Sequence, residues 1–146
     1  MKILIDADGC PVVDECVALA YQHNIDCLIL CDTSHQIERA HAVTKIITKG
    51  KDSVDFALIE LIEDHDIIIT QDYGLASMCL AFKVTVMNQD GLLYTTTNID
   101  QLLMQRALAH KIRRSGGKTK GPAKRKAKQN ETFKQALAQA IVQNLP

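Results

Sequence analysis

Two aspartates follow the first apolar run of the chain. Asp6 and Asp8 come directly after residues 3–5, a run too short to cross a membrane and suited to a buried strand. Pro11 then opens a helical stretch, as a first-turn proline does. Two carboxylates at the end of a strand repel each other unless a cation or a proton lies between them. A cation site is one interpretation of the pair. The other is that Asp6 ends the strand and Asp8 caps the helix.

Three further aspartates stand at the same kind of junction. Asp52 and Asp55 lie at the head of a helix predicted for residues 52–63, and Asp72 follows a strand predicted for residues 66–70. In a parallel sheet these junctions face one edge, so we expect all five acids to meet there. Each of the three, taken alone, is also explained as a helix cap.

Five carboxylates at one edge of a sheet predict a site for a divalent cation. Their mutual repulsion is costly without a counter-charge, and oxygen ligands without a histidine or cysteine cluster suit Mg²⁺ or Mn²⁺. One or two such ions can activate a water and stabilise a phosphoryl transition state. The predicted metal ligands are Asp6, Asp8, Asp52, Asp55 and Asp72, and the predicted catalytic residues are Asp6, Asp8, Asp55 and Asp72.

Strand-like runs alternate with helical patterns through most of the chain. Strands are predicted at residues 3–5, 25–30, 43–48, 66–70 and 84–87, and helices at residues 12–23, 52–63 and 72–82, with a short one around residues 36–41. This alternation predicts an α/β three-layer sandwich with a mostly parallel central sheet.

The pattern changes near residue 98. Asn98 is expected to cap a long helix that ends at Ser115, and a last helix over residues 131–143 is expected to pack back on the domain. Residues 116–129 are rich in glycine and lysine and have no apolar periodicity, which predicts a mobile, unpacked arm. We therefore divide the chain into an α/β domain, residues 1–115, and a basic arm with a C-terminal helix, residues 116–146.

Length and composition indicate a single globular domain. The chain has 146 residues, 47% of them hydrophobic, and no apolar run approaches the roughly 18 residues of a membrane span. The first residues pass directly into a strand and leave no room for a signal peptide. The five cysteines form no CxxC pair, which favours free thiols in a reducing compartment. We expect a cytoplasmic protein with no membrane partner.

The net charge of zero hides a strong asymmetry. Residues 1–105 hold 16 of the 17 acidic residues but only 6 of the 17 lysines and arginines, so this part carries a charge of −10 and the remainder +10. A basic arm predicts a polyanionic partner, here a nucleic acid and most simply RNA. The expected phosphate contacts are Lys49, Lys51, Lys111, Arg113, Arg114, Lys118, Lys120, Lys124, Arg125, Lys126 and Lys128. A homodimer is left open.

Five stretches together resemble a known bacterial family. They are IDADGCPV at 5–12, KGKDSVDFALI at 49–59, TQDYGLA at 70–76, TTTNIDQLL at 95–103 and GGKTKGP at 116–122. The chain is similar to the uncharacterised YaiI/YqxD family, also known as UPF0178 or DUF188, over almost its whole length. That family is similar in turn to PIN and NYN nuclease domains, which hold Mg²⁺ or Mn²⁺ at clustered acids and cut RNA.

The resemblance implies a PIN-like fold and a role for individual acids. Asp6, Asp55 and Asp72 match the PIN-type acid positions, and Asp8 and Asp52 match acids typical of the family itself. Glu38 is the candidate for a fourth PIN acid. The resemblance therefore implies a metal-dependent phosphodiesterase, specifically a ribonuclease.

Two other functions stay open. The start IDADGC resembles the DxDGT motif of haloacid-dehalogenase phosphatases, in which the first aspartate is a nucleophile, although Cys10 replaces the threonine. A nucleic-acid-binding or adaptor protein with a degenerate metal site is the third reading, because no general base is identified. Cys10 precedes a helix N-terminus, which can lower a thiol pKa, but no histidine motif accompanies it.

Overall fold

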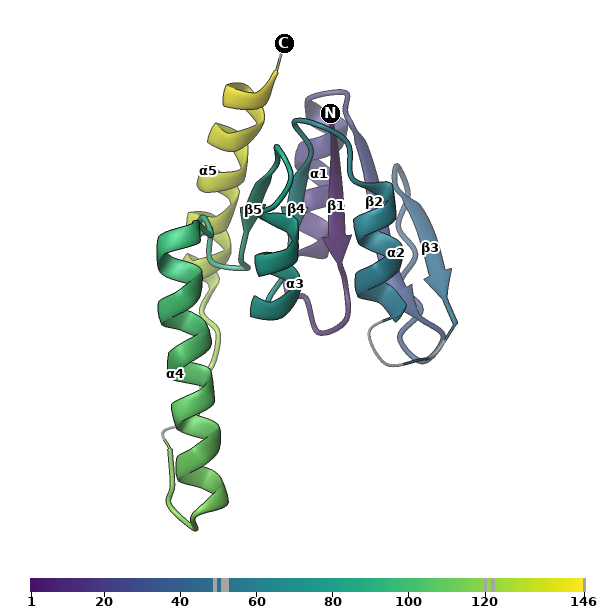
Figure 1. Cartoon of the computed structure of the whole chain (residues 1–146). Helices are drawn as coiled ribbons and strands as arrows, with labels where there is room; N and C mark the ends of the chain where they lie inside the picture. Colours follow the sequence, from purple (N-terminus) through teal and green to yellow (C-terminus); the bar gives the residue numbers. More distant parts are fainter. Residues whose placement is uncertain (49, 51–52, 120, 122, 146) are drawn as a thin grey trace.

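Five parallel strands form the centre of the molecule (Figure 1). The computed structural model describes residues 1–48, 50, 53–119, 121 and 123–145. The strands are β1 (Lys2–Asp6), β2 (Asp26–Asp32), β3 (Val43–Ile47), β4 (Ile67–Ile69) and β5 (Thr85–Met87). Their order in the sheet is β3-β2-β1-β4-β5, and every pairing between them is parallel. The predicted α/β fold with a parallel central sheet is confirmed.

Helices cover both faces of this sheet and make three layers (Figure 1). The helices are α1 (Val13–Gln22), α2 (Ser53–Leu61), α3 (Tyr73–Cys79), α4 (Thr96–Arg114) and α5 (Ala127–Asn144). Helices α1 and α5 contribute to one apolar core, and α2, α3 and the start of α4 contribute to the other.

The alternation of side chains along the strands separates the two cores. Ile3 and Ile5 of β1 pack in the core under α1 and α5, while Leu4 between them packs in the opposite core. The three strands at the centre are buried on both faces, which is why they read as continuous apolar runs. Phe133 is fully buried and anchors α5 to the first core.

The strand order reverses beside β1. The chain moves outward from β1 to β2 and β3, then returns across β1 to form β4 and β5. In open α/β sheets, ligands bind at such a switch point, outside the carboxyl ends of the strands. Asp6 ends β1, and Asp72 follows β4 by three residues, so the sequence places both acids at this switch point.

Three local predictions are wrong. Residues 36–41 form no helix: Ile37 packs against the first core, Arg39 pairs with Asp14, and His41 has a positive φ of 67° and stacks on Tyr21. Such tertiary contacts outweigh a weak local helical pattern.

The N-terminus of α4 and the start of α5 also differ from expectation. Thr95, not Asn98, is the N-cap of α4, and Asn98 is its capping-box partner three residues on. Helix α5 begins at Ala127, within the stretch expected to be an unpacked arm. The capping residues Lys126 and Gln129 begin it there, through the bond from the Lys126 amide to Gln129 Oε1 at 2.7 Å.

Helix α4 projects from the body of the molecule beyond the carboxyl ends of the strands (Figure 1). Ile99 near its start is its buried residue, and the last turn carries Lys111, Arg113 and Arg114. Within the described ranges no helix has both the length and the apolar character needed to cross a bilayer.

Candidate active site

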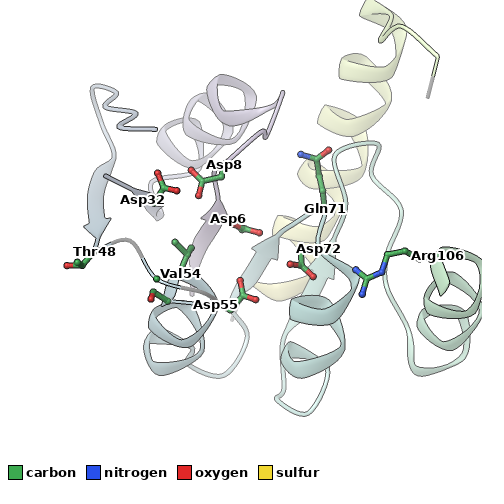
Figure 2. Close-up of a pocket in the computed structure, with 11 residues that line it drawn as sticks. Asp6, Asp8, Asp32, Thr48, Val54, Asp55, Gln71, Asp72 and Arg106 are labelled. Atoms are coloured by element: carbon green, nitrogen blue, oxygen red, sulfur yellow. The ribbon is translucent and has the colours of Figure 1, made fainter. Parts of the chain in front are cut away.

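A cleft of about 480 Å³ lies at the carboxyl ends of β1, β2 and β4 (Figure 2). It brings together four of the five predicted metal ligands: Asp6, Asp8, Asp55 and Asp72. The cleft is lined by Asp6, Asp8, Asp32, Thr48, Gly50, Ser53, Val54, Asp55, Gln71, Asp72 and Arg106. The fifth predicted ligand, Asp52, lies outside the described residues, as do Lys49, Lys51 and Lys120.

Asp6 is a half-buried acid of this cleft. The Thr70 hydroxyl donates a 2.8 Å hydrogen bond to Asp6 Oδ2, and Thr70 Oγ1 accepts a 3.0 Å bond from the Asp72 amide. Burial raises the pKa of Asp6 to about 6; the Thr70 hydrogen bond opposes this rise, and the charges of Asp72 and Asp8 add to it. A cation in the cleft would therefore stabilise a carboxylate that is costly to ionise in its absence.

Asp72 has two structural tasks at once. Its Oδ1 caps α3 by accepting from the amides of Gly74 (2.8 Å) and Leu75 (3.1 Å), so the capping interpretation is confirmed. The cap fixes the direction of the carboxylate, and no described residue donates a hydrogen bond to its Oδ2. Figure 2 shows Asp6, Asp55 and Asp72 gathered in the same part of the cleft. One carboxylate can therefore cap a helix and still offer an oxygen to a ligand.

Asp8 and Asp32 line the other side of the cleft, and His35 lies beside them. One ligand atom from each lies within 4.8 Å of the others, a spacing that suits a metal ion. His35 Nδ1 is 3.0 Å from Asp32 Oδ1 and 3.8 Å from Asp8 Oδ1. Desolvation raises the pKa of Asp32, but the hydrogen bonds from His35 and the Ser34 amide outweigh it and hold this pKa below its ordinary value. Asp8 Oδ1 is buried and has no hydrogen-bond partner.

The loops after β1 and β4 are tied together. Gln71 Nε2 donates a 2.7 Å hydrogen bond to the carbonyl oxygen of Gly9, whose φ of 72° favours glycine. Burial raises the pKa of the neighbouring Cys10 thiol to about 11, so the effect of the helix N-terminus does not prevail. A thiol at this position is protonated at neutral pH and a poor nucleophile.

Two cleft residues are missed by the sequence patterns. Asp32 ends β2 just as Asp6 ends β1, and this repetition is a signal that could have identified it. Arg106 lies in the middle of α4 and reaches the cleft only because that helix packs against α3. No pattern in the sequence around Arg106 predicts that it lies at the cleft. Glu38, the candidate fourth acid, is exposed and does not line the cleft.

The predicted phosphate contacts fall into two groups. Lys111, Arg113, Arg114, Lys118, Lys124, Lys126 and Lys128 are exposed. Arg125 is different: its guanidinium pairs with Asp90 at 2.7 Å and donates to the Gln89 carbonyl oxygen and to Asn130 Oδ1. The expectation that residues 124–128 are unpacked is therefore wrong at Arg125, because these bonds tie it to the loop after β5.

Comparison with known sequences assigns the family. The protein-family model described as "Uncharacterized BCR, YaiI/YqxD family" matches residues 4–143. The chain belongs to the YaiI/YqxD family. A UPF0178 protein of Exiguobacterium sibiricum is 45% identical over 143 residues, which cover 98% of both chains. A UPF0178 protein of Ruminiclostridium cellulolyticum is 43% identical over 137 residues, covering 94% of this chain and 90% of the relative. No solved structure matches the chain.

Proposed function

We propose that this YaiI/YqxD protein is a cytoplasmic, metal-dependent phosphodiesterase that cuts single-stranded RNA. The observation that carries the proposal is the convergence of five aspartates from four elements on one cleft at the switch point of the sheet. Asp6, Asp8 and Asp32 come from the ends of β1 and β2, Asp55 from α2 and Asp72 from the start of α3. The five cysteines are free thiols, which suits a reducing compartment.

The chemistry of the cleft fits a hard divalent cation. Asp8 Oδ1 is buried and lacks a hydrogen-bond donor, and Asp6 is held where ionisation is costly. Asp6, Asp8, Asp55 and Asp72 would hold Mg²⁺ or Mn²⁺ through oxygen atoms. Such an ion, when bound, supplies an activated water and offsets charge on the phosphate.

The protein's own residues position these groups. Thr70 fixes Asp6 relative to the Asp72 backbone, and the α3 cap fixes the Asp72 carboxylate. Arg106 faces the cleft from α4 and carries a guanidinium suited to phosphate oxygens. With Cys10 protonated, the loop after β1 presents no thiolate nucleophile, so solvent is the expected source of the attacking oxygen. Cleavage by water should leave a 5′-phosphate.

The basic end of α4 and the arm would hold the RNA backbone. Lys111, Arg113 and Arg114 stand on the part of α4 that projects beyond the acidic edge (Figure 1). Charge reversal of Lys124, Lys126 and Lys128, with Arg125 kept, should make the salt dependence of RNA binding shallower by roughly 0.7 log units per lost contact. An unchanged slope would mean that these lysines do not touch RNA.

A nucleic-acid-binding or adaptor protein is the second candidate. One observation favours it: among the described residues, the trio that meets the spacing for a metal ion is Asp8, Asp32 and His35, which leaves out Asp6, Asp55 and Asp72. Such a protein would bind RNA through the same basic surface without cutting it.

Cleavage assays separate these functions. Labelled RNA should be cut slowly with Mn²⁺, be protected by EDTA, and be cut at least a hundredfold more slowly by Asp72→Asn. The matched control is Asp26→Asn, an exposed aspartate at the opposite end of β2, which should cut at the wild-type rate. Activity that survives both EDTA and Asp72→Asn would contradict the proposal, and RNA binding without cleavage would favour the adaptor. Hydrolysis of a small phosphate monoester but not RNA would favour the phosphatase.

A further inference from the structure

A second hollow opens directly beside the acidic cleft. Its volume is about 400 Å³, and it shares Asp55, Asp72 and Arg106 with the cleft. The rest of its lining comes from α2 and α3: Phe56, Gly74 and Met78. A ligand whose charged part lies among the acids can therefore extend into this hollow without leaving the surface.

The added wall of this hollow is largely apolar. Phe56 is 60% exposed and Met78 is 40% exposed, although α2 and α3 both turn other side chains into the core. Single exposed apolar residues are ordinary on a protein surface. Here two of them line one concave space beside a charged cleft, which is the composition of a subsite for a flat, uncharged ring.

Arg106 lines both the acidic cleft and the hollow beside it. Its guanidinium carbon lies 6.0 Å from the centroid of the Tyr73 ring, and Tyr73 meets Tyr94 edge to face at 6.1 Å. Tyr94 is itself buried and donates a 3.2 Å hydrogen bond to the Thr70 carbonyl oxygen. The tyrosines thus link Arg106 to the residue that holds Asp6.

The guanidinium of Arg106 is available to an anion. Arg106 takes part in none of the ion pairs formed among the described residues, although Asp55 and Asp72 line the same spaces. An arginine held by an aromatic face, with its donors unpaired by carboxylates, suits a phosphate group. It lies where the phosphate of a ligand that spans both spaces would pass.

We propose that this hollow binds one unpaired nucleobase of a single-stranded nucleic acid, with Arg106 on the adjoining phosphate. This inference rests on the proposed function, since it names a subsite of the same cleft. The base stacks on Phe56 and contacts Met78, while the neighbouring phosphate reaches the acidic cleft. A base within a duplex is stacked on both sides and cannot enter, so the hollow selects single strands.

The test measures binding, so it does not depend on cleavage. The Asp72→Asn protein is titrated with a short single-stranded RNA and with the same RNA made abasic at one position after another. Phe56→Ala should weaken binding roughly 5- to 100-fold, the loss expected for one stacked base. Phe56→Leu should restore less than half of the lost free energy, because it keeps apolar bulk but no ring. The matched control, Phe82→Ala, removes an exposed phenylalanine that lines neither space and should bind like its parent.

A double-mutant cycle identifies the base. At one position, loss of the base should weaken binding to the parent protein and have no further effect in Phe56→Ala. Arg106→Gln should lower the salt slope by roughly 0.7 log units, and Phe56→Ala should leave that slope unchanged.

The results distinguish this inference from the proposed function. Full additivity at every position, or equal losses in Phe56→Ala and Phe82→Ala, would overturn the base subsite even in a protein that cuts RNA. The expected cycle in a protein that cuts nothing would support the subsite and contradict the phosphodiesterase. No binding of single strands at all would overturn both. Thermal melts of each variant confirm that losses come from the folded protein.

Discussion

The acids at the two ends of the parallel strands, here called the amino edge and the carboxyl edge of the sheet, have opposite surroundings. At the amino edge, Asp66 is 1% exposed and accepts hydrogen bonds from the Lys2 amide (2.9 Å), the Lys2 ammonium (2.7 Å) and the Glu63 amide (2.8 Å). At the carboxyl edge, no described lysine or arginine pairs with Asp6, Asp8, Asp32 or Asp72.

The difference separates an acid that a neighbouring lysine neutralises from acids that no described lysine or arginine neutralises. Asp66 and Lys2 neutralise each other: desolvation alone would lower the pKa of Lys2, but its bonds to Asp66 and Glu63 raise it. The carboxyl-edge acids instead leave a buried oxygen without a donor on Asp8 and a raised pKa on Asp6. Uncompensated charge in a cleft is a cost that a bound cation can remove, and it marks the candidate site.

Removing the amino-edge acid should have the largest effect on stability. Asp66→Asn leaves the Lys2 ammonium, whose side chain is 14% exposed, without its buried counter-charge. We expect the free energy of unfolding to fall by about 3 kcal/mol or more, as when one partner of a buried pair is lost. Urea denaturation measures this, and Asp64→Asn, on the exposed residue two positions earlier, is the control. The response of the melting temperature to Mn²⁺ should persist; its loss would contradict the separation of the two edges.

Asp6 should give the metal-free protein an unusual dependence on pH. Its folded pKa of about 6 exceeds the ordinary value of 3.8, so between these values the folded state binds more protons than the unfolded state. Stability therefore falls as the pH rises from 4 to 7, by at most about 3 kcal/mol from this group. The measurement is the free energy of unfolding of wild type minus that of Asp6→Asn against pH, in EDTA. A flat difference would show that Asp6 ionises as freely as a surface carboxylate.

The sequence predicts the strands and the meeting of the acids well, and it predicts contacts between distant segments poorly. The five strands and their alternation with helices follow from apolar runs and helical periodicity. The central strands are continuous apolar runs because both of their faces are buried. The sequence also predicts that Asp6, Asp8, Asp55 and Asp72 meet, because parallel topology takes them to one edge.

What the sequence does not predict depends on contacts between distant segments. Arg106 reaches the cleft through the packing of α4 on α3, and Arg125 is tied down by Asp90, 35 residues earlier in the chain. Neither contact produces a periodic pattern in the sequence. Residues 36–41 fail as a helix for the same reason, since Ile37 and His41 are held by partners elsewhere.

Metal binding should sharpen the contrast at the carboxyl edge. Mn²⁺ at 100 times its Kd should stabilise the protein by about 2.7 kcal/mol, a rise in melting temperature of roughly 8 °C. Asp8→Asn removes the charge of the carboxylate that carries the buried oxygen. This change should weaken the binding of Mn²⁺ at least tenfold, about 1.4 kcal/mol. Calorimetric titration and thermal melts give the two values. An Asp8→Asn protein with wild-type affinity would remove Asp8 from the site, and Asp26→Asn provides the matched control.

Thr70 should produce the smallest effect and the most specific one. The threonine is 1% exposed, and its hydroxyl joins Asp6 Oδ2 to the Asp72 amide. Thr70→Val keeps the shape of the side chain but leaves that amide without its acceptor, so the free energy of unfolding should fall by about 1–2 kcal/mol. Thr132→Val is the control, because its hydroxyl bonds to the Lys128 carbonyl oxygen on the exposed side of α5.

The pH profile distinguishes a specific role for Thr70 from a general loss of packing. The Thr70 hydrogen bond lowers the pKa of Asp6, so Thr70→Val should raise that pKa further above 6. The fall in stability of the metal-free protein should then extend to higher pH than in wild type, and the same shift should be absent in Thr132→Val. An unmoved transition in Thr70→Val would mean that burial and the neighbouring carboxylates set the ionisation of Asp6 without help from the hydroxyl. A transition that moves to lower pH would contradict the hydrogen bond itself. Losing a donor to the ionised carboxylate disfavours ionisation and can only raise the pKa of Asp6.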